Sequence, residues 1–189
     1  AVGCGSSSDS SSSTADSAQS TEAAADGATF KIGGIGPITG GAAIYGQAVM
    51  NAAQMAVDKI NADGGINGYQ VEFRFEDDEH DAEKSVNAYN TLKDWGMQML
   101  MGTVTSTPCT PVSAKTEEDN MFQLTPSGSA VESIAPANAF RVCFSDPNQG
   151  TASAQYIGEN KLANKVAVIY NSSDVYSSGI YQTFATEAA

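Results

Sequence analysis

The sequence has little positive charge, a single histidine and no long hydrophobic run. Its 189 residues include 9 Lys and Arg against 22 Asp and Glu, with one His, one Trp and three Cys. The net charge of −13 repels phosphate backbones, so nucleic acid is not expected as a partner. No apolar run reaches the roughly 18 residues that a membrane-spanning helix needs. The length allows one domain or one and a half.

The first 29 residues combine an early cysteine with a long polar tract. Cys4 is preceded by a small residue and followed by a Ser-rich, acidic stretch. This resembles the end of a bacterial lipoprotein signal peptide, whose cysteine becomes the lipidated N-terminus. The resemblance implies a lipid anchor at Cys4 and an extracytoplasmic location at the cell membrane. The charged and apolar parts of such a signal are missing, so we expect the chain to begin inside a longer protein.

The alternative is a cysteine that merely lies beside a disordered tail. In either case residues 5–29 are too polar to bury a core, and we expect them to be disordered. A flexible coil of this length spans roughly 25–30 Å, enough to lift a domain off a membrane. We therefore assign residues 1–29 to the signal end and linker.

From Phe30 onward, short apolar runs alternate with segments of helical periodicity. The expected strands are Phe30–Ile35, Val71–Phe75, Gln98–Val104, Met121–Thr125, Phe140–Phe144 and Val166–Tyr170. The expected helices are Ala42–Asn61, a segment spanning Ala82 to Leu92, Pro111–Asp119, Gln149–Asn160 and one that begins near Val175. This alternation predicts an α/β fold with a doubly wound parallel sheet.

The first five strands suffice for one complete layer, so we assign residues 30–145 to a first lobe. Residues 146–189 are assigned to a crossover and to the start of a second lobe. One strand and one helix cannot close a core. We therefore expect the chain to be the N-terminal part of a longer protein.

The stretch GIGPITGG, residues 34–41, follows the first expected strand. That position suits a ligand site, because ligands bind at the carboxyl ends of the strands in doubly wound sheets. The spacing excludes a dinucleotide fingerprint, since its third glycine position holds Thr39, and it excludes a P-loop, since Ala42 follows Gly41. We expect no nucleotide cofactor. The glycines are interpreted as turn residues that bring a loop close to a small uncharged or zwitterionic ligand.

Hydroxyl residues follow the third and the fourth expected strands, at 105–107 and 125–129. Hydroxyls and free backbone N–H groups at helix N-termini form a modest anion site. This site suits a carboxylate held without arginine. The alternative is that these residues only cap helices.

Six blocks of the sequence resemble branched-chain amino acid binding proteins and occur in the same order. They are GPITGGAAIYG, INADGGINGYQVEF, EDDEHDAEKSVNAYN, MGTVTSTPCTP, LTPSGSAVES and FRVCFSDPNQG. Those proteins are extracytoplasmic receptors of ABC importers with the type I periplasmic-binding fold. The resemblance implies two lobes joined by crossover strands, an amino acid bound in the cleft by hinge closure, a membrane permease as partner, and no enzymatic activity. Residues 145–150 are the hinge candidate.

The resemblance also implies a set of ligand-binding residues. Hydroxyls after the third and fourth strands would hold the ligand carboxylate together with nearby backbone groups, and two aromatic residues would pack on the ligand, one of them from the second lobe. The acidic partner of the ligand ammonium would follow residue 189. The implied residues are Tyr45, Ser106, Thr107 (through its backbone N–H), Ser127 (through its backbone), Ser129 and Tyr176.

Three alternatives remain open for the function: the sensor domain of a signalling receptor, a receptor for amides or urea, and an enzyme on a Rossmann-like sheet. Cys109 and Cys143 either form a disulfide or remain two half-buried thiols. The acidic run around His80 is expected to be a solvated loop, with Asp81 capping the next helix, rather than a metal site. No serine or cysteine is paired with His80 in the sequence, so nucleophilic catalysis is not expected.

Overall fold

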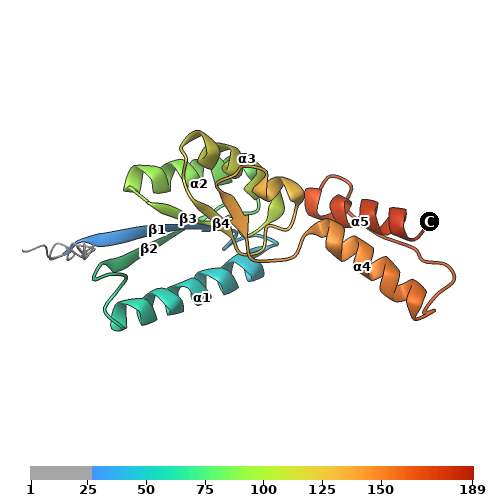
Figure 1. Cartoon of the computed structure of the whole chain (residues 1–189). Coiled ribbons are helices and arrows are strands. Elements are labelled where there is room, and N and C mark those ends of the chain that lie inside the picture. Colours follow the sequence, from blue (N-terminus) through green and yellow to red (C-terminus); the bar gives the residue numbers. More distant parts are fainter. Residues whose placement is uncertain (1–26) are drawn as a thin grey trace, which may run out of the picture.

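A five-stranded parallel sheet forms the centre of the protein (Figure 1). The computed structural model describes residues 27–189, so the predicted lipidation of Cys4 and most of the predicted linker lie outside the described residues. The strand order is β2-β1-β3-β4-β5, and every pair is parallel. This confirms the predicted α/β fold with a doubly wound sheet. The strands are β1 (Thr29–Gly36), β2 (Gln70–Asp77), β3 (Met99–Gly102), β4 (Gln123–Thr125) and β5 (Ala139–Arg141).

Helices cover both faces of the sheet. In Figure 1, α1 lies on one face, whereas α2 and α3 lie on the other. None of the described helices is long and apolar enough to cross a membrane. The helices are α1 (Ala43–Ala62), α2 (Ala82–Trp95), α3 (Ser106–Glu118), the 3-10 helix η1 (Val131–Ile134), α4 (Asp146–Glu159) and α5 (Val175–Glu187).

The core lies between the sheet and the α2–α3 face. Tyr89 and Leu92 of α2 are completely buried, as are Ile35 and Leu100 of the sheet and Val112 of α3. Full burial of one such side chain contributes about 1.5–3 kcal/mol. The apolar periodicity of these elements therefore fixes which face of each helix meets the sheet.

Two glycines of the GIGPITGG stretch were predicted to be turn residues, and for these the prediction is wrong. Gly34 and Gly36 lie inside β1. A Cβ atom at Gly34 would come within 2.4 Å of the Phe75 ring, and one at Gly36 within 2.4 Å of Val104 Cγ2. These glycines make room for neighbouring side chains, and the turn begins only at Pro37.

Two predicted elements have wrong bounds. Helix α3 begins at Ser106 rather than Pro111, because Pro111 lies within the helix instead of at its first turn. Strand β5 ends at Arg141, whereas the prediction continued to Phe144. The apolar residues after Arg141 belong to the connection into α4, and several of them are exposed.

The predicted strand Val166–Tyr170 is absent. This segment has no regular secondary structure and pairs with no strand among the described residues. Ile169 is 99% exposed, and Val166 and Val168 are also exposed. A strand needs a neighbouring strand to form hydrogen bonds with its backbone N–H and C=O groups. Residues 27–189 provide no such neighbour for this segment.

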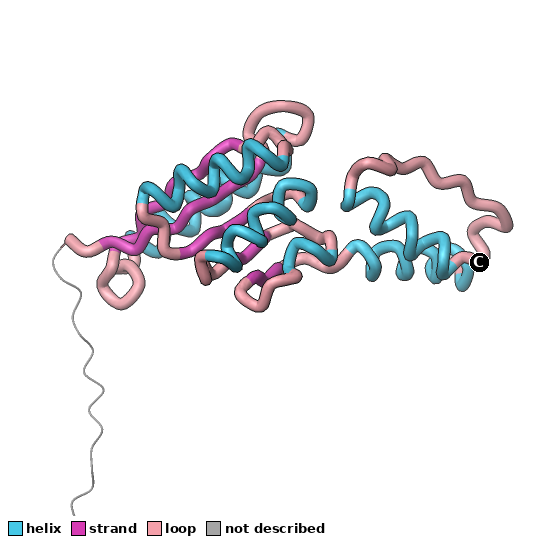
Figure 2. The backbone as a smooth tube through the Cα atoms, turned by 90° about the horizontal axis from the view of Figure 1, so that it is seen from above, coloured by secondary structure: helices cyan, strands magenta, loops and turns pink. Residues whose placement is uncertain are grey.

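Helices α4 and α5 pack side by side beyond the carboxyl edge of the sheet (Figures 1 and 2). Their contact is close, because a Cβ at Gly150 would lie 2.0 Å from Thr183 Oγ1. The hinge candidate, residues 145–150, forms the cap and first turns of α4, with the Ser145 hydroxyl accepting from Asn148 N at 3.3 Å. Residues 145–150 thus belong to the start of a helix, and the hinge stays a prediction.

Candidate ligand pocket at the carboxyl edge of the sheet

A pocket of about 470 Å³ opens where β3, β4 and β5 end. Its walls come from the starts of α1, α3 and α5 and from the loops after β2, β4 and β5. No lysine or arginine is among its lining residues, so a bound carboxylate would be held by neutral groups. The lining residues are Ala42, Tyr45, His80, Val104, Thr105, Ser106, Ser127, Ser129, Cys143, Phe144, Asp174 and Tyr176.

Five of the six predicted ligand-binding residues line this pocket. They come from four separate parts of the chain, and the sixth, Thr107, lies next to the pocket but is not part of its lining. The Thr107 hydroxyl instead donates to Asp174 Oδ1 at 3.0 Å. The five lining residues are Tyr45, Ser106, Ser127, Ser129 and Tyr176.

The N-terminus of α3 forms one wall. Thr105 is the N-cap residue, with φ −113° and ψ 152°, but its side chain makes no capping bond. The first N–H groups of a helix have no partner within the helix, and its N-terminus carries partial positive charge. The Ser106 hydroxyl accepts from Ala130 N at 3.1 Å, which leaves its proton for an acceptor in the pocket. This wall therefore has the chemistry of an anion subsite.

The loop after β4 forms the adjacent wall and is held by its own hydroxyls. Thr125 Oγ1 donates to Thr103 O at 2.6 Å and accepts from Gly128 N at 2.7 Å. The Ser127 hydroxyl donates to Val104 O. That bond uses the hydroxyl proton of Ser127. The backbone of Ser127 therefore remains the predicted contact with a ligand.

Arg141 and Asp146 support Ser129 from behind. Arg141 Nη1 donates to the Ser129 carbonyl at 2.8 Å, and Asp146 N donates to the same oxygen at 3.0 Å. Asp146 is only 1% exposed, and burial raises the pKa of its carboxyl group above the ordinary value. Neither residue was predicted from the sequence. Arg141 ends β5 and Asp146 begins α4, so both flank the connection between these elements. The hydrophobic pattern of the sequence did not show the course of that connection.

The loop after β1 leads into the first turn of α1, which brings Tyr45 to the pocket. Asp77 at the end of β2 fixes this loop, since its carboxylate accepts from Ile38 N at 2.9 Å and from the Thr39 hydroxyl. Burial raises the pKa of Asp77, but these hydrogen bonds outweigh it and hold the pKa below its usual value. Tyr45 remains 64% exposed and free to contact a ligand.

His80 lies in the pocket wall, contrary to the prediction of a solvated loop. Its Nδ1 is 2.9 Å from Thr105 Oγ1. The neighbouring Asp78 is completely buried, and burial raises its pKa to about 6. The other half of the prediction is confirmed, because Asp81 caps α2 by accepting from Lys84 N at 2.8 Å. The position of the acidic run at the carboxyl end of a strand was the signal that could have placed His80 in the site.

Cys109 and Cys143 are free thiols, so the disulfide alternative is not borne out. Cys109 points into the interior of the first lobe, where Gln123 Nε2 lies 3.4 Å from its sulfur and burial raises its pKa. Cys143 instead lines the pocket. The two thiols thus occupy separate environments. Among residues 27–189, no cluster of three or more His, Cys, Asp or Glu side chains could hold a metal ion.

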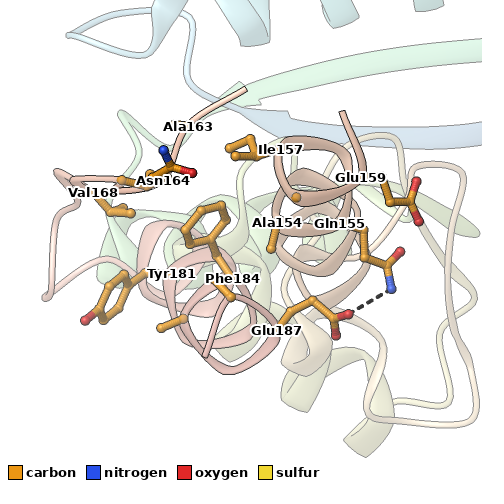
Figure 3. A pocket seen from close by; sticks show the side chains of 14 residues that line it. Ala154, Gln155, Ile157, Glu159, Ala163, Asn164, Val168, Tyr181, Phe184 and Glu187 are labelled. Atoms are coloured by element: carbon orange, nitrogen blue, oxygen red, sulfur yellow. Dashed lines mark hydrogen bonds between the residues drawn. The ribbon is translucent and has the colours of Figure 1, made fainter. Parts of the chain in front are cut away.

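A larger hollow of about 780 Å³ lies between α4, α5 and the segment 163–168 (Figure 3). In Figure 3, Ile157 and Phe184 point toward it. Gln155 Nε2 donates to Glu187 Oε1 at 3.0 Å along its edge. The hollow shares no lining residue with the hydroxyl-lined pocket.

Comparison with known proteins agrees with this arrangement. The sequence matches the periplasmic binding protein family over residues 29–189. The chain belongs to this family. Within it, the Leu/Ile/Val-binding protein BraC3 of Rhizobium johnstonii is 35% identical over 159 residues, which cover 83% of this chain and 43% of that protein. The leucine-, isoleucine-, valine-, threonine- and alanine-binding protein of Pseudomonas aeruginosa is 32% identical over 154 residues, covering 80% of this chain and 41% of that protein.

Solved structures of the same family share the fold. The branched-chain amino acid transporter substrate-binding protein LivJ of Streptococcus pneumoniae, solved in complex with isoleucine, superposes with a TM-score of 0.79 at 28% identity. The match covers 84% of this chain and 46% of that one. The chain thus has the type I periplasmic-binding fold and spans less than half the length of the relatives it matches.

Proposed function

We propose that the chain is part of an extracytoplasmic receptor of an ABC importer that binds a branched-chain or similar amino acid. The observation that carries the proposal is the meeting of Tyr45, Ser106, Ser127, Ser129 and Tyr176 around one pocket. These residues were predicted as ligand contacts from the sequence alone. The names of the relatives, which refer to leucine, isoleucine and valine, support the same class of ligand.

The carboxylate of the ligand would bind at the start of α3. The Ser106 hydroxyl, the Ser129 hydroxyl and the backbone N–H of Thr107 would donate to it, and the positive end of the helix would favour its charge. A buried charge is costly unless it is paired or hydrogen-bonded. These neutral N–H and O–H groups would donate hydrogen bonds to the carboxylate, so no lysine or arginine is needed. The aromatic rings of Tyr45 and Tyr176 would pack on the ligand side chain.

Residues 146–189 would begin a second lobe that closes over the first. The α4–α5 pair contributes Tyr176 and Asp174 to the pocket, which is what a second lobe is expected to do. The apolar hollow in Figure 3 would be filled by the remainder of that lobe. Hinge closure around the ligand would then exclude water and complete the site.

The receptor would be held at the membrane by a lipid on Cys4 and would deliver its ligand to the permease. Residues 5–29 would serve as the spacer between the anchor and the rest of the receptor. It would not act as an enzyme. His80 is hydrogen-bonded to Thr105 Oγ1, and within the described part of the chain its ring makes no hydrogen bond to a serine or cysteine.

Thermal unfolding with candidate ligands tests the proposal. The protein is expressed from its complete reading frame and scanned with aliphatic amino acids, amides, urea and NAD. A ligand present at a thousand times its dissociation constant should stabilise the fold by about 4 kcal/mol. A shift confined to aliphatic amino acids supports the proposal, whereas a shift only with amides or urea changes the ligand, and one only with NAD rejects the receptor function.

A matched pair of variants tests the carboxylate subsite. Ser106→Ala removes a hydroxyl whose proton is directed to the ligand, so we expect affinity to fall by about tenfold or more, as for a hydrogen bond to a charged group. Ser153→Ala on the exposed face of α4 removes a hydroxyl that bonds only to Gln149 O, at 2.7 Å, and should leave affinity unchanged. Equal ligand affinity in the two variants would mean that the ligand carboxylate does not bind to the Ser106 hydroxyl.

A further inference from the structure

Asp174 is the only carboxylate among the described residues that line the ligand pocket. It is the N-cap residue of α5, and its φ of −102° and ψ of 124° are typical of that position. The lining contains no lysine or arginine. Asp174 therefore brings a negative charge to the pocket wall, and no lysine or arginine of the lining neutralises it.

Two hydrogen bonds hold the Asp174 carboxylate in place. Its Oδ1 accepts from the Thr107 hydroxyl at 3.0 Å, and its Oδ2 accepts from Ser177 N at 2.9 Å. A carboxylate has about four lone-pair sites, so each oxygen keeps one for a ligand. Because the group is already oriented, binding a ligand through it costs little additional entropy.

Asp174 lies beside the proposed carboxylate subsite. Its partner Thr107 is in the first turn of α3, and the backbone N–H of Thr107 is one of the proposed donors to the ligand carboxylate. In an α-amino acid, the ammonium and carboxylate groups are bonded to one carbon atom. An acceptor for the ammonium must therefore lie next to the donors for the carboxylate, and Asp174 has this position.

A second carboxylate, that of Asp146, lies near Asp174. Burial raises the pKa of Asp146, the charge of Asp174 adds to this effect, and the charge of Arg141 opposes it. Asp146 is only 1% exposed and is not among the residues that line the pocket. Of the two carboxylates, only Asp174 can contact a ligand.

We propose that Asp174 is a specificity-determining residue that pairs with the ammonium group of the bound amino acid. The pocket then selects amino acids over acids of the same shape that lack the ammonium. This inference rests on the proposed function, and Asp174 would act together with the acidic partner expected after residue 189. An acid without the ammonium would bring its carboxylate next to Asp174 with no positive charge between them, and like charges in a closed cleft repel each other.

The same ion pair would make the ligand a bridge between the two predicted lobes. The ligand carboxylate would bind at the start of α3, and the ligand ammonium would bind at the cap of α5. One small molecule would thus contact both elements. Salt would weaken this ion pair little, because a pair enclosed in a cleft is screened less than an exposed one.

Ligands that differ only in the ammonium group test the proposal. Leucine and valine are each compared with the α-hydroxy acid of the same carbon skeleton, in which a hydroxyl replaces the ammonium. Dissociation constants are measured by titration calorimetry on the protein from its complete reading frame. The test variant is Asp174→Asn, because asparagine caps a helix about as well as aspartate but carries no charge. Asp174→Ser, which also keeps a good cap, is the second uncharged variant.

We expect the affinity for the amino acid to fall about tenfold to hundredfold in Asp174→Asn, as when a hydrogen bond to a charged group is removed. The α-hydroxy acid should bind as well as before or better, because the repulsion is gone. Asp81→Asn is the matched control, since Asp81 caps α2 by accepting from Lys84 N at 2.8 Å and does not line the pocket. It should leave the affinity for both ligands unchanged.

Three results would overturn the inference. An equal loss of affinity for the amino acid and the α-hydroxy acid in both Asp174 variants means that the residue only supports the structure. Unchanged affinity for the amino acid means that Asp174 does not contact the ammonium. In both cases the receptor function stands. A wild-type protein that binds no amino acid removes the proposed function and this inference with it.

Discussion

The hydroxyl of Thr107 donates to the carboxylate of Asp174 at 3.0 Å, which joins the first turn of α3 to the cap of α5. Asp174 also accepts from Ser177 N at 2.9 Å through its other oxygen, so one carboxylate both caps α5 and holds it to the first lobe. The two residues are 67 positions apart. This bond fixes the place where the α4–α5 pair meets the pocket.

Replacement of Thr107 by valine should loosen that attachment. The variant keeps the shape of the side chain but removes the hydroxyl, and a hydrogen bond to a partly exposed charged group is worth about 1 kcal/mol. We expect a lower melting temperature and faster amide exchange in α5, measured by hydrogen exchange and mass spectrometry. Thr91→Val is the control, because its hydroxyl bonds only within α2, at 3.0 Å. Unchanged exchange in α5 would show that the contact does not hold the helix.

Asp78 should make stability depend on pH. Its folded pKa of about 6 lies above the ordinary 3.8, so the folded state binds the proton more tightly than the unfolded state. The free energy of unfolding should therefore fall by about 2 kcal/mol as pH rises from 4 to 7. Asp78→Asn keeps the oxygen that accepts from His80 N and removes this dependence. Urea denaturation across this pH range measures it.

Asp77 should show the opposite sign. Hydrogen bonds hold its folded pKa below the ordinary value, so its contribution is present at neutral pH and is lost as pH falls through the folded pKa. Asp77→Asn should therefore destabilise the protein at pH 7 and have less effect in acid. The same denaturation series measures both variants. Parallel pH profiles for Asp77→Asn and Asp78→Asn would contradict both assignments.

Gly46 should tolerate no side chain. A Cβ at this position would lie 1.8 Å from the Pro37 carbonyl oxygen, a contact that the backbone can relieve only by moving the loop that carries Tyr45. Gly46→Ala should cost about 1–3 kcal/mol of stability, as overpacking does, and should weaken ligand binding. Gly41→Ala is the matched control, because nothing lies within 4 Å of its Cβ position. Calorimetric melting compares the two, and equal stability would mean that the loop shifts without cost.

The exposed apolar segment 166–170 should make the 189-residue chain prone to association. Ile169 is 99% exposed and follows Val168, which lines the hollow of Figure 3. Apolar surface of this kind promotes aggregation. We expect the chain alone to bind a hydrophobic dye and the protein from the complete reading frame not to. Light scattering of Ile169→Ser should decrease relative to the parent chain. Dye binding of equal strength in both proteins would argue against a second lobe that covers this segment.

The sequence predicted the order of the elements well because their apolar periodicity is local. Residues of α2 such as Tyr89 and Leu92 repeat on one face, and the strands are short apolar runs between turns. The start of α3 was predicted too late, because a proline usually marks the first turn and Pro111 does not. The segment 166–170 has the composition of a strand, but pairing is a non-local property that composition cannot guarantee.

The site was partly predictable for a similar reason. Ser106 and Ser129 follow expected strands, and the carboxyl ends of parallel strands meet at one edge. His80 follows a strand as well, but its charged neighbours suggested a surface loop. What the sequence did not show is that Asp78 turns inward and anchors that loop. Likewise, the support of Ser129 by Arg141 depends on the path of the chain after β5.

The absence of lysine and arginine from the pocket lining has a consequence for the conditions in which the pocket works. Interactions between full charges weaken as ionic strength rises, whereas short hydrogen bonds from hydroxyls and helix N–H groups in a closed cleft are little affected. Capture through Ser106 and Ser129 should therefore be nearly insensitive to salt. The surface charge of −13 exerts no net pull on a zwitterion but repels anionic amino acids. A receptor built in this way would keep its affinity in dilute and in saline surroundings alike.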